Sequence, residues 1–301
     1  MAGTSNVNTP IRNVLISLAN GMKPKFVHTL RPCLLLVTIA GGCSQFSPPP
    51  EHSHEDLDAT VWMRTSAEYF GAARQAFAIA TAQLETAVAD PNWTALPEQQ
   101  AAWNNDPQMS RPQQAAVIID LDETVLDNSL YQVELIDNST EFGRDTWNQW
   151  VDRTDAGLVP GARDFINTAR ERGVHIFFVT NRSHENEPAT RRALEELEIL
   201  TDDAPDDILS KGERDSWTSD KTTRRLFVAK RYRVLLLIGD DLNDFVWAGY
   251  QPSADVRRNL AWTHANMWGH RWFIIPNANY GGWERACMDL TTHCLAEKKY
   301  N

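Results

Sequence analysis

The sequence predicts an α/β fold in which a parallel β-sheet carries helices on both faces. Three short apolar runs, at 115–119, 174–179 and 233–239, each end in polar residues, and the segments between them contain the prolines and glycines that begin and end helices. Wholly apolar strands that alternate with helices are typical of a parallel sheet buried on both faces. The chain of 301 residues, 42% of them hydrophobic, can bury a sizeable core, which excludes intrinsic disorder and collagen-like structure.

Charge is distributed unevenly along the chain. There are 29 Lys and Arg against 40 Asp and Glu, a net charge of −11, which argues against a protein that coats nucleic-acid polymers. Residues 1–42 contain four of the basic residues and no acidic one, so that the other 25 basic residues accompany all 40 acidic ones, a net charge of −15. This asymmetry indicates a targeting segment in front of an acidic folded body.

The N-terminal segment has the layout of a secretory signal peptide. From Met22 onward it has a basic stretch, an apolar run over 33–40 and small residues before Cys43. The apolar run is too short for a transmembrane helix, which needs about 20 such residues. The small residues before Cys43 resemble a bacterial lipobox, after which the cysteine is lipidated. Two points stay open: whether translation starts at Met1 or Met22, and whether an ordinary signal peptidase leaves Cys43 unmodified.

We therefore expect a signal peptide over 1–42 and a flexible, lipid-anchored tether over 43–56, which is rich in Ser, Pro and charge. The protein would then be exported to the bacterial cell envelope, as a lipid-anchored outer-membrane or periplasmic protein. Cys287 and Cys294 are seven residues apart, so that a disulfide between them requires a break in any helix containing both, and two free thiols are the alternative.

The folded body begins with a helical segment. Over 57–88, apolar residues recur at helical spacing, which predicts one long helix or two stacked ones. Residues 90–113, rich in Pro, Asn and Gln, are typical of a loop. Further helices are expected between the strands, over 160–172, 188–200 and 219–232. The expected organisation is thus an N-terminal helical segment over 57–108 and a core over 109–301.

Polar side chains gather where the three expected strands end: Asp120 and Asp122 after the first, Thr180, Asn181 and Arg182 after the second, and Asp240, Asp241 and Asp244 after the third. The carboxyl ends of parallel strands meet at one edge of the sheet, where ligands bind. Carboxylates collected there repel one another unless a cation lies among them, and hard oxygen ligands suit Mg²⁺. Hydroxyl and amide donors suit phosphate oxygens, and Lys221 at the start of a helix favours an anion.

These residues also allow structural interpretations that involve no catalysis. Taken singly, each aspartate could be a turn former or a helix N-cap. DLDET alone could belong to a calcium loop, but Val125 and Tyr131 stand where an EF-hand needs Gly and Glu. The sequence also lacks the glycine loops of nucleotide-binding folds and the His and Cys spacing of a zinc site. The joint arrangement at three strand ends is what points to catalysis.

Four motifs carry a family resemblance: DLDET at 120–124, the apolar run ending in TNR at 180–182, the lysine of SDKTTR at 219–224, and GDDLND at 239–244. Their order and spacing resemble those of the haloacid dehalogenase-like (HAD) superfamily. VWMRTSAEY, DLDETVLDNSLY, TWNQWV and PNANYGGWE resemble more closely the class C non-specific acid phosphatases, the DDDD group typified by bacterial lipoprotein e. The resemblance implies a HAD-like Rossmannoid sheet with a small cap insertion near 128–159.

The resemblance also implies roles for the aspartates. Asp120 would be the nucleophile that forms an aspartyl-phosphate, and Asp122 would be the general acid and then the general base. Mg²⁺ would be held by the Asp120 carboxylate, the Asp122 carbonyl and the Asp240 carboxylate. Asp244 would orient a metal-bound water or Lys221 from outside this set. Asp241 departs from the usual GDN of related sequences and adds a negative charge beside the metal.

Substrate contacts are implied in the same way. The residues expected to bind phosphate are Thr180, Asn181 and Lys221. The aromatic residues expected to stack on a nucleobase or another flat group are Trp147, Tyr280 and Trp283. Trp150, Trp262, Trp268 and Trp272 are interpreted as packing residues.

The sequence thus predicts an exported, Mg²⁺-dependent acid phosphatase that hydrolyses phosphate monoesters, nucleoside monophosphates included, through an aspartyl-phosphate. The expected partners are small phosphate esters, and the membrane only through the N-terminal lipid. One alternative is a non-catalytic lipoprotein on a HAD fold that binds haem or another flat ligand, and another is a phosphotransferase to alcohol acceptors. The physiological substrate, the pH optimum and homo-oligomer formation stay open.

Overall fold

The computed structural model describes residues 56–109, 111–112, 114–201 and 205–287, and the structural statements below refer to these residues. The expected signal peptide, the two alternative start sites and Cys43 lie outside the described residues, as does the expected tether except for its last residue. Within the described part of the chain, no helix has both the length and the apolar character needed to cross a membrane.

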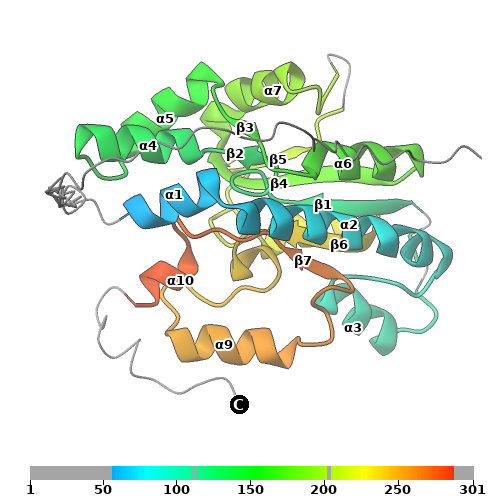
Figure 1. Ribbon diagram of the computed structural model, residues 1–301. Coiled ribbons are helices and arrows are strands. Elements are labelled where there is room, and N and C mark those ends of the chain that lie inside the picture. Colours follow the sequence, from blue (N-terminus) through cyan, green and yellow to red (C-terminus); the bar gives the residue numbers. More distant parts are fainter. Residues whose placement is uncertain (1–55, 110, 113, 202–204, 288–301) are drawn as a thin grey trace, which may run out of the picture. The chain divides into compact units, whose positions relative to one another are not determined.

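A five-stranded sheet forms the centre of the fold (Figure 1). Its strands are β1 (Ala115–Ile119), β4 (His175–Ser183), β5 (Ile208–Lys211), β6 (Arg233–Gly239) and β7 (Trp272–Ile274). The strand order is β5-β4-β1-β6-β7, and every pairing is parallel. The predicted α/β fold with a parallel sheet is confirmed. Because β1 lies between β4 and β6, the three strands whose ends carry the sequence motifs are neighbours.

Both faces of the sheet are buried by helices. Val117 of β1 belongs to a core cluster that includes residues of α2 (Ala67–Ala89) and α6 (Ala162–Glu171). The next residue, Ile118, points to the opposite face and belongs to a second cluster that includes a residue of α8 (Thr222–Ala229). Successive side chains of a strand point to opposite faces of the sheet. A strand that is apolar at every position therefore needs helices packed on both faces.

The N-terminal segment forms two helices, α1 (Leu57–Thr65) and α2. The chain breaks between them at Ser66, whose hydroxyl accepts a hydrogen bond from the backbone N–H of Tyr69 and so caps α2. Two side chains of α1 bond to distant segments: Thr60 Oγ1 donates to Asn279 Oδ1 at 3.0 Å, and Arg64 Nη1 donates to Ser129 Oγ at 2.9 Å. Helix α1 therefore joins two segments that lie far apart in the sequence.

The expectation of a loop over 90–113 is wrong in part, because this segment contains helix α3 (Pro97–Asn105). Proline at the first helical position has no N–H to leave unpaired, and its backbone angle already suits a helix. Trp103 is buried on one side of α3, and the Gln99 side-chain amide donates to the backbone carbonyls of Ala229 and Tyr232 at 3.0 and 2.9 Å. These tertiary contacts stabilise a helix whose polar composition gives little sign of it.

The range in which a cap was expected contains two helices framed by a short antiparallel pair of strands. These elements are β2 (Leu126–Asp127), α4 (Ser129–Asn138), α5 (Arg144–Arg153) and β3 (Gly157–Leu158). The remaining elements are η1 (His184–Asn186), α7 (Glu187–Glu196), η2 (Leu242–Asp244), α9 (Ala254–Thr263) and α10 (Gly282–Arg285). Cys287 follows α10 and is disulfide-bonded, and its partner is not among the described residues.

Candidate active site

Three carboxylates meet at the carboxyl edge of the sheet. Asp120 follows β1, Asp240 follows β6, and Asp244 ends η2, and one oxygen of each lies within 4.8 Å of the other two. Lys221, the N-cap residue of α8, donates from Nζ to Asp120 Oδ1 and, at 2.6 Å, to Asp244 Oδ1. Asp120, Lys221 and Asp244 are each less than a tenth exposed. The structure thus brings together residues from three of the four sequence motifs.

The turn after β6 orients Asp244. The Asp241 side chain accepts from the backbone N–H of Asn243 at 2.9 Å, and the Asp244 side chain accepts from the backbone N–H of Asp241 at 3.0 Å, which forms a capping box around η2. Gly239 leaves the necessary space, because a Cβ atom at that position would overlap the Asp244 side chain. The glycine of GDDLND is therefore required by a close approach of the carboxylate to the strand.

Burial and the repulsion of neighbouring carboxylates make Asp120 and Asp240 hard to ionise. Burial raises the pKa of Asp120 to about 7, against the lowering effect of Lys221. Burial, followed by the charges of Asp244 and Asp120, raises the pKa of Asp240 well above its usual range. Burial lowers the pKa of Lys221, but the two carboxylates it contacts raise it above its usual value. A single ammonium group does not balance three carboxylates, so the site has the charge and the hard oxygen donors that suit a divalent cation.

Asp122 lies beside this group and is held by a different cation. Its carboxylate accepts from Arg182 Nη2 at 2.7 Å and from Arg182 Nε at 3.0 Å, and it also accepts from Asn128 Nδ2 at 2.9 Å. The Arg182 guanidinium is buried and lies 5.7 Å from the centroid of the Trp147 ring. The sequence interpretation gave Arg182 no role of its own. Its place in the TNR motif, close after an apolar run, is the signal that could have identified it.

Asn128 connects the Asp122 loop to the cap helices. Its side-chain oxygen accepts from the indole Nε1 of Trp150 at 2.9 Å, and its backbone N–H donates to Glu123 Oε1 at 3.0 Å. Glu123 has a positive φ of 57° and is completely buried. Burial, followed by the charge of Asp122, raises the pKa of Glu123 well above its usual range. Trp150 is buried, in line with the packing role expected for it.

The expected phosphate-binding residues Thr180 and Asn181 lie within β4, because this strand continues to Ser183 rather than ending at residue 179 as expected, and hydrogen bonds hold both side chains. Thr180 Oγ1 accepts from the backbone N–H of Arg182 at 3.0 Å. Asn181 is exposed, and its Oδ1 accepts from Arg224 Nη2 at 2.7 Å. Arg224 also donates to the Thr180 carbonyl and, at 2.6 Å, to the Thr218 carbonyl. One buried guanidinium of α8 therefore holds the C-terminal part of β4 against the segment that precedes α8.

Comparison with known protein families decides the identity of this site. A family model described as HAD superfamily, subfamily IIIB (Acid phosphatase) matches residues 60–283. The chain belongs to this acid phosphatase subfamily. It is therefore a phosphatase, a hydrolase for which the family indicates small phosphate monoesters as substrates and a divalent metal as cofactor.

Solved structures give the same assignment. The phosphatase is similar to the class C acid phosphatase from Bacillus anthracis, with 26% identity and a TM-score of 0.65 over 78% of this chain and 88% of that chain. The crystal structure of the class C acid phosphatase from Bacillus anthracis with tungstate bound matches with 27% identity and a TM-score of 0.63 over the same shares. The resemblance to class C enzymes expected from the sequence is confirmed.

The expected aromatic residues of the phosphatase lie at different depths. Tyr280 donates from its hydroxyl to Glu123 Oε2, which places it against the DLDET loop. Trp147 of α5 is half-buried beneath Arg182. Trp283 has 46% of its surface exposed. Trp147 and Tyr280 thus reach the Asp122 loop from the cap and from the C-terminal segment, and Trp283 lies further out.

A second group of potential ligands in the phosphatase consists of His184, Glu187 and Glu213. His184 Nδ1 lies 2.9 Å from Glu187 Oε2, and the Ser210 hydroxyl donates to the same carboxylate at 2.9 Å. His184 is more than half exposed. Because His184 is exposed and Glu187 already has polar partners, a surface contact between these two side chains explains why the group lies together.

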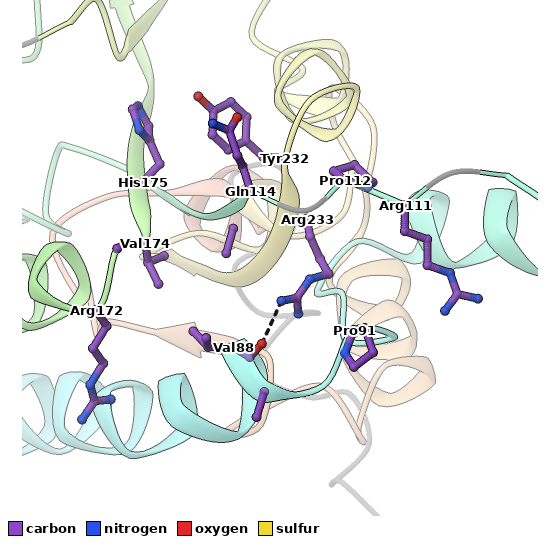
Figure 2. A pocket seen from close by; sticks show the side chains of 13 residues that line it. Val88, Pro91, Arg111, Pro112, Gln114, Arg172, Val174, His175, Tyr232 and Arg233 are labelled. Atoms are coloured by element: carbon purple, nitrogen blue, oxygen red, sulfur yellow. Dashed lines mark hydrogen bonds between the residues drawn. The ribbon is translucent and has the colours of Figure 1, made fainter.

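A cavity of about 400 Å³ opens at the opposite edge of the sheet (Figure 2). It is lined by His175 and Arg233, the first residues of β4 and β6. The Arg233 guanidinium donates to the Val88 carbonyl at 2.9 Å at the end of α2, and His175 Nε2 lies 2.7 Å from Asp207 Oδ1. Arg233 and His175 thus already have hydrogen-bond partners within the protein. The cavity is separate from the group of carboxylates formed by Asp120, Asp240 and Asp244.

Proposed function

We propose that the chain is an exported, Mg²⁺-dependent acid phosphatase that hydrolyses phosphate monoesters, including nucleoside monophosphates, through an aspartyl-phosphate. The observation that supports this most strongly is the contact of buried Lys221 with both Asp120 and Asp244, beside Asp240. The Lys221 ammonium and a divalent cation would then both lie beside the Asp120 carboxylate. This arrangement would place a nucleophile next to a site that binds an anion.

The residues that would hold Mg²⁺ are Asp120, Asp240 and the Asp122 carbonyl, with Asp244 in the same group of oxygens. The donor set fits the ion, because it offers only hard oxygen ligands and carries more negative charge than Lys221 balances. When bound, the ion supplies charge neutralisation to the phosphoryl oxygens.

In the first half of the reaction, an Asp120 carboxylate oxygen forms a bond to phosphorus as the bond to the ester oxygen breaks. The Asp122 carboxyl group donates its proton to the leaving oxygen, so that an alcohol departs. Lys221 and the Thr180 hydroxyl stabilise the negative oxygens of the phosphoryl group. Arg182 holds the Asp122 side chain in one orientation through two hydrogen bonds.

In the second half, a water molecule attacks phosphorus while Asp122, now a carboxylate, accepts the proton of that water. The bond between phosphorus and the Asp120 oxygen breaks, which releases inorganic phosphate and restores the Asp120 carboxylate. Asp122 thereby returns to its protonated form. Hydrolysis is thus divided into two displacements at phosphorus. In each of them Asp120 forms or breaks the bond to phosphorus and Asp122 transfers the proton.

Aromatic residues near the Asp122 loop support flat leaving groups as the substrate class. Trp147, Tyr280 and Trp283 would stack against a nucleobase or another ring. The tungstate bound by the Bacillus anthracis enzyme is a tetrahedral oxyanion, as phosphate is. Lys221, together with Thr180 and Asn181 in the C-terminal part of β4, would offer the matching donors for phosphate in this chain.

The activity is tested by hydrolysis of 4-nitrophenyl phosphate by the purified protein in Mg²⁺ and in EDTA. We expect Asp120→Asn to lower kcat by about 10³-fold or more, because the amide is a very poor nucleophile. Asp58→Asn, which changes an exposed aspartate on α1, is the matched control and should keep the activity. Equal turnover by wild type and Asp120→Asn would contradict the nucleophile assignment, and inactivity of the wild type under all conditions would favour a non-catalytic ligand-binding lipoprotein.

Export and lipid anchoring are proposed from the segment between Met22 and Cys43. A basic stretch, a short apolar run and small residues before a cysteine support lipoprotein processing. Lipid labelling of the full chain in a bacterial host should be lost in Cys43→Ala and in the presence of globomycin. Unchanged processing without any lipid label would instead indicate cleavage by the ordinary signal peptidase.

A further inference from the structure

Asp241, the second aspartate of GDDLND, does not join the carboxylates of the active site. Its Oδ2 accepts from the backbone N–H of Gly282 at 2.6 Å and from Arg257 Nη2 at 3.1 Å. The group of oxygens that could hold a metal does not include it. Burial by itself raises the pKa of Asp241, but Arg257 and the backbone donors lower it below its usual value. The additional charge is therefore balanced by an arginine.

The Asp241–Arg257 pair is largely buried, with 17% of the Asp241 side chain and 12% of the Arg257 side chain exposed. Arg257 belongs to α9, which has no buried residue of its own in the structure, so this side chain is a principal inward contact of that helix. The guanidinium packs directly on the chain at Gly282, where a Cβ atom would overlap Arg257 Nη1. Aspartate, arginine and glycine thus form one closely packed unit.

Gly282 lies between the two aromatic residues of the C-terminal segment. Tyr280 precedes it by two positions and bonds to Glu123 of the DLDET loop, while Trp283 follows it directly at the start of α10. Asn277 of the same segment donates to Asp240 Oδ2 at 2.8 Å. The segment is held to the active site through Asn277 and Tyr280, and Asp241 holds it at Gly282.

We propose that the Asp241–Arg257 pair positions the 280–283 turn and so sets the preference of the enzyme for flat leaving groups. This inference rests on the proposed function, in which Tyr280 and Trp283 contact the leaving group. Neither Asp241 nor Arg257 touches the reacting atoms, and both act through the backbone of Gly282. Loss of one partner leaves a buried charge without its counter-ion and releases the turn.

The test compares two esters that share the phosphoryl group and differ in the leaving group: a nucleoside 5′-monophosphate with a flat base, and glycerol phosphate with no ring. For Arg257→Gln we expect KM to rise about ten-fold for the nucleotide and less than about two-fold for glycerol phosphate, with kcat within about three-fold for both. Asp241→Asn keeps an acceptor for the Gly282 N–H and should lie between wild type and Asp241→Ala. Arg258→Gln, on the same helix beside a surface aspartate, is the matched control.

Inhibition by inorganic phosphate shows whether a variant has a damaged phosphate site. The inhibition constant of inorganic phosphate should be equal in wild type and Arg257→Gln, because the variant alters only the position of the 280–283 turn. Equal KM increases for the two esters, a loss confined to kcat, or no change in any variant would overturn the proposal. If Arg257→Gln does not fold, Asp241→Asn gives the same comparison without altering α9, whereas Asp241→Ala also removes the cap of η2 that orients Asp244. Failure of the wild type to hydrolyse either ester would contradict the proposed function itself, whereas wild-type turnover of glycerol phosphate alone would contradict only the preference for flat groups.

Discussion

Arg182 shows how one residue can connect the catalytic loop to the cap. It binds Asp122 through two nitrogen atoms, and it lies over Trp147 of α5. A guanidinium is planar and presents parallel donors to a carboxylate, whereas an ammonium group offers only a point charge. The orientation of Asp122, and with it the direction of the proton donation that we propose for this residue, therefore depends on arginine specifically.

We predict that Arg182→Lys lowers kcat for 4-nitrophenyl phosphate by about ten- to a hundred-fold, because lysine keeps the charge but loses the paired hydrogen bonds. Steady-state kinetics and circular dichroism together check this prediction. Native spectra with full activity would show that the charge alone is sufficient.

Gly239 provides a second prediction at the scale of one residue. We expect Gly239→Ala to displace Asp244 from Lys221, since the new methyl group would occupy the space of the carboxylate. Overpacking of this kind costs about 1–3 kcal/mol of unfolding free energy, which urea denaturation measures, and the phosphatase activity should fall as well. The control is Gly71→Ala in α2, where no atom lies within 4 Å of the added Cβ and the change should stabilise the protein slightly. Two equally stable, active variants would contradict the prediction.

The charged residues at the strand ends could be predicted from the sequence, whereas most of the residues that pair with them could not. Asp120, Asp240 and Lys221 could be proposed from motif spacing, and the structure brings them to one edge of the sheet. The acceptors of Arg182 and Arg257 could not be predicted, because a guanidinium finds its acceptors through packing between elements rather than through local periodicity. The direction taken by Asp241 depends on Arg257, which comes from another helix.

Among the elements, α8 links the two loops that flank the active site. Arg224 donates to the carbonyls of Thr180 and Thr218, and the adjacent Arg225 donates to those of Asn243 and Asp244 at 3.1 Å each. Both arginines are almost completely buried. One helix therefore holds the C-terminal part of β4 and the chain after β6 at a constant separation, with Lys221 as the N-cap residue of that helix.

We predict that Arg224→Met destabilises the protein by about 3 kcal/mol or more. Methionine fills much of the space, but the carbonyls of Thr180 and Thr218 would lose their buried donor. Urea denaturation measures the change, and Arg214→Met, which replaces an arginine stacked on Trp217 and Phe227, serves as a control with a smaller expected loss. Equal losses in the two variants would contradict a special role for the buried contacts.

The elements missed from the sequence are short or polar. Strand β5 has four residues and β7 has three, too few for a distinct pattern, and both are sheet edges defined by pairing. Helix α3 has few apolar residues and depends on tertiary contacts of Gln99 and Trp103. By contrast, β1 and β6 were predicted at their observed positions, because both are continuous apolar runs that the sheet buries on two faces.

At the scale of the whole molecule, the buried carboxylates link stability to pH and metal. Asp120, with its pKa raised from 3.8 to about 7, and Asp240 hold protons in the folded state that the unfolded chain releases near pH 4. The folded state then binds more protons than the unfolded state, so the unfolding free energy of the metal-free protein falls as pH rises from about 4 to 7. A bound divalent cation replaces those protons and removes this loss.

We therefore predict that saturating Mg²⁺ raises Tm more at pH 7 than at pH 5. Thermal denaturation in EDTA and in Mg²⁺ at several pH values checks this. The Asp240→Asn variant should lose most of the metal effect, because one of the proposed ligands becomes neutral. An equal Tm increase at both pH values, or an undiminished one in Asp240→Asn, would contradict the linkage.

The two hydrogen bonds of α1 decide where the functional enzyme begins. A chain shortened to start at Ala67 would keep every strand and every carboxylate of the site. It would lack helix α1 and therefore both of its hydrogen bonds, the one from Thr60 to Asn279 and the one from Arg64 to Ser129. An attachment ahead of Leu57, as the proposed lipid anchor would provide, therefore holds the enzyme by an element that borders its active site.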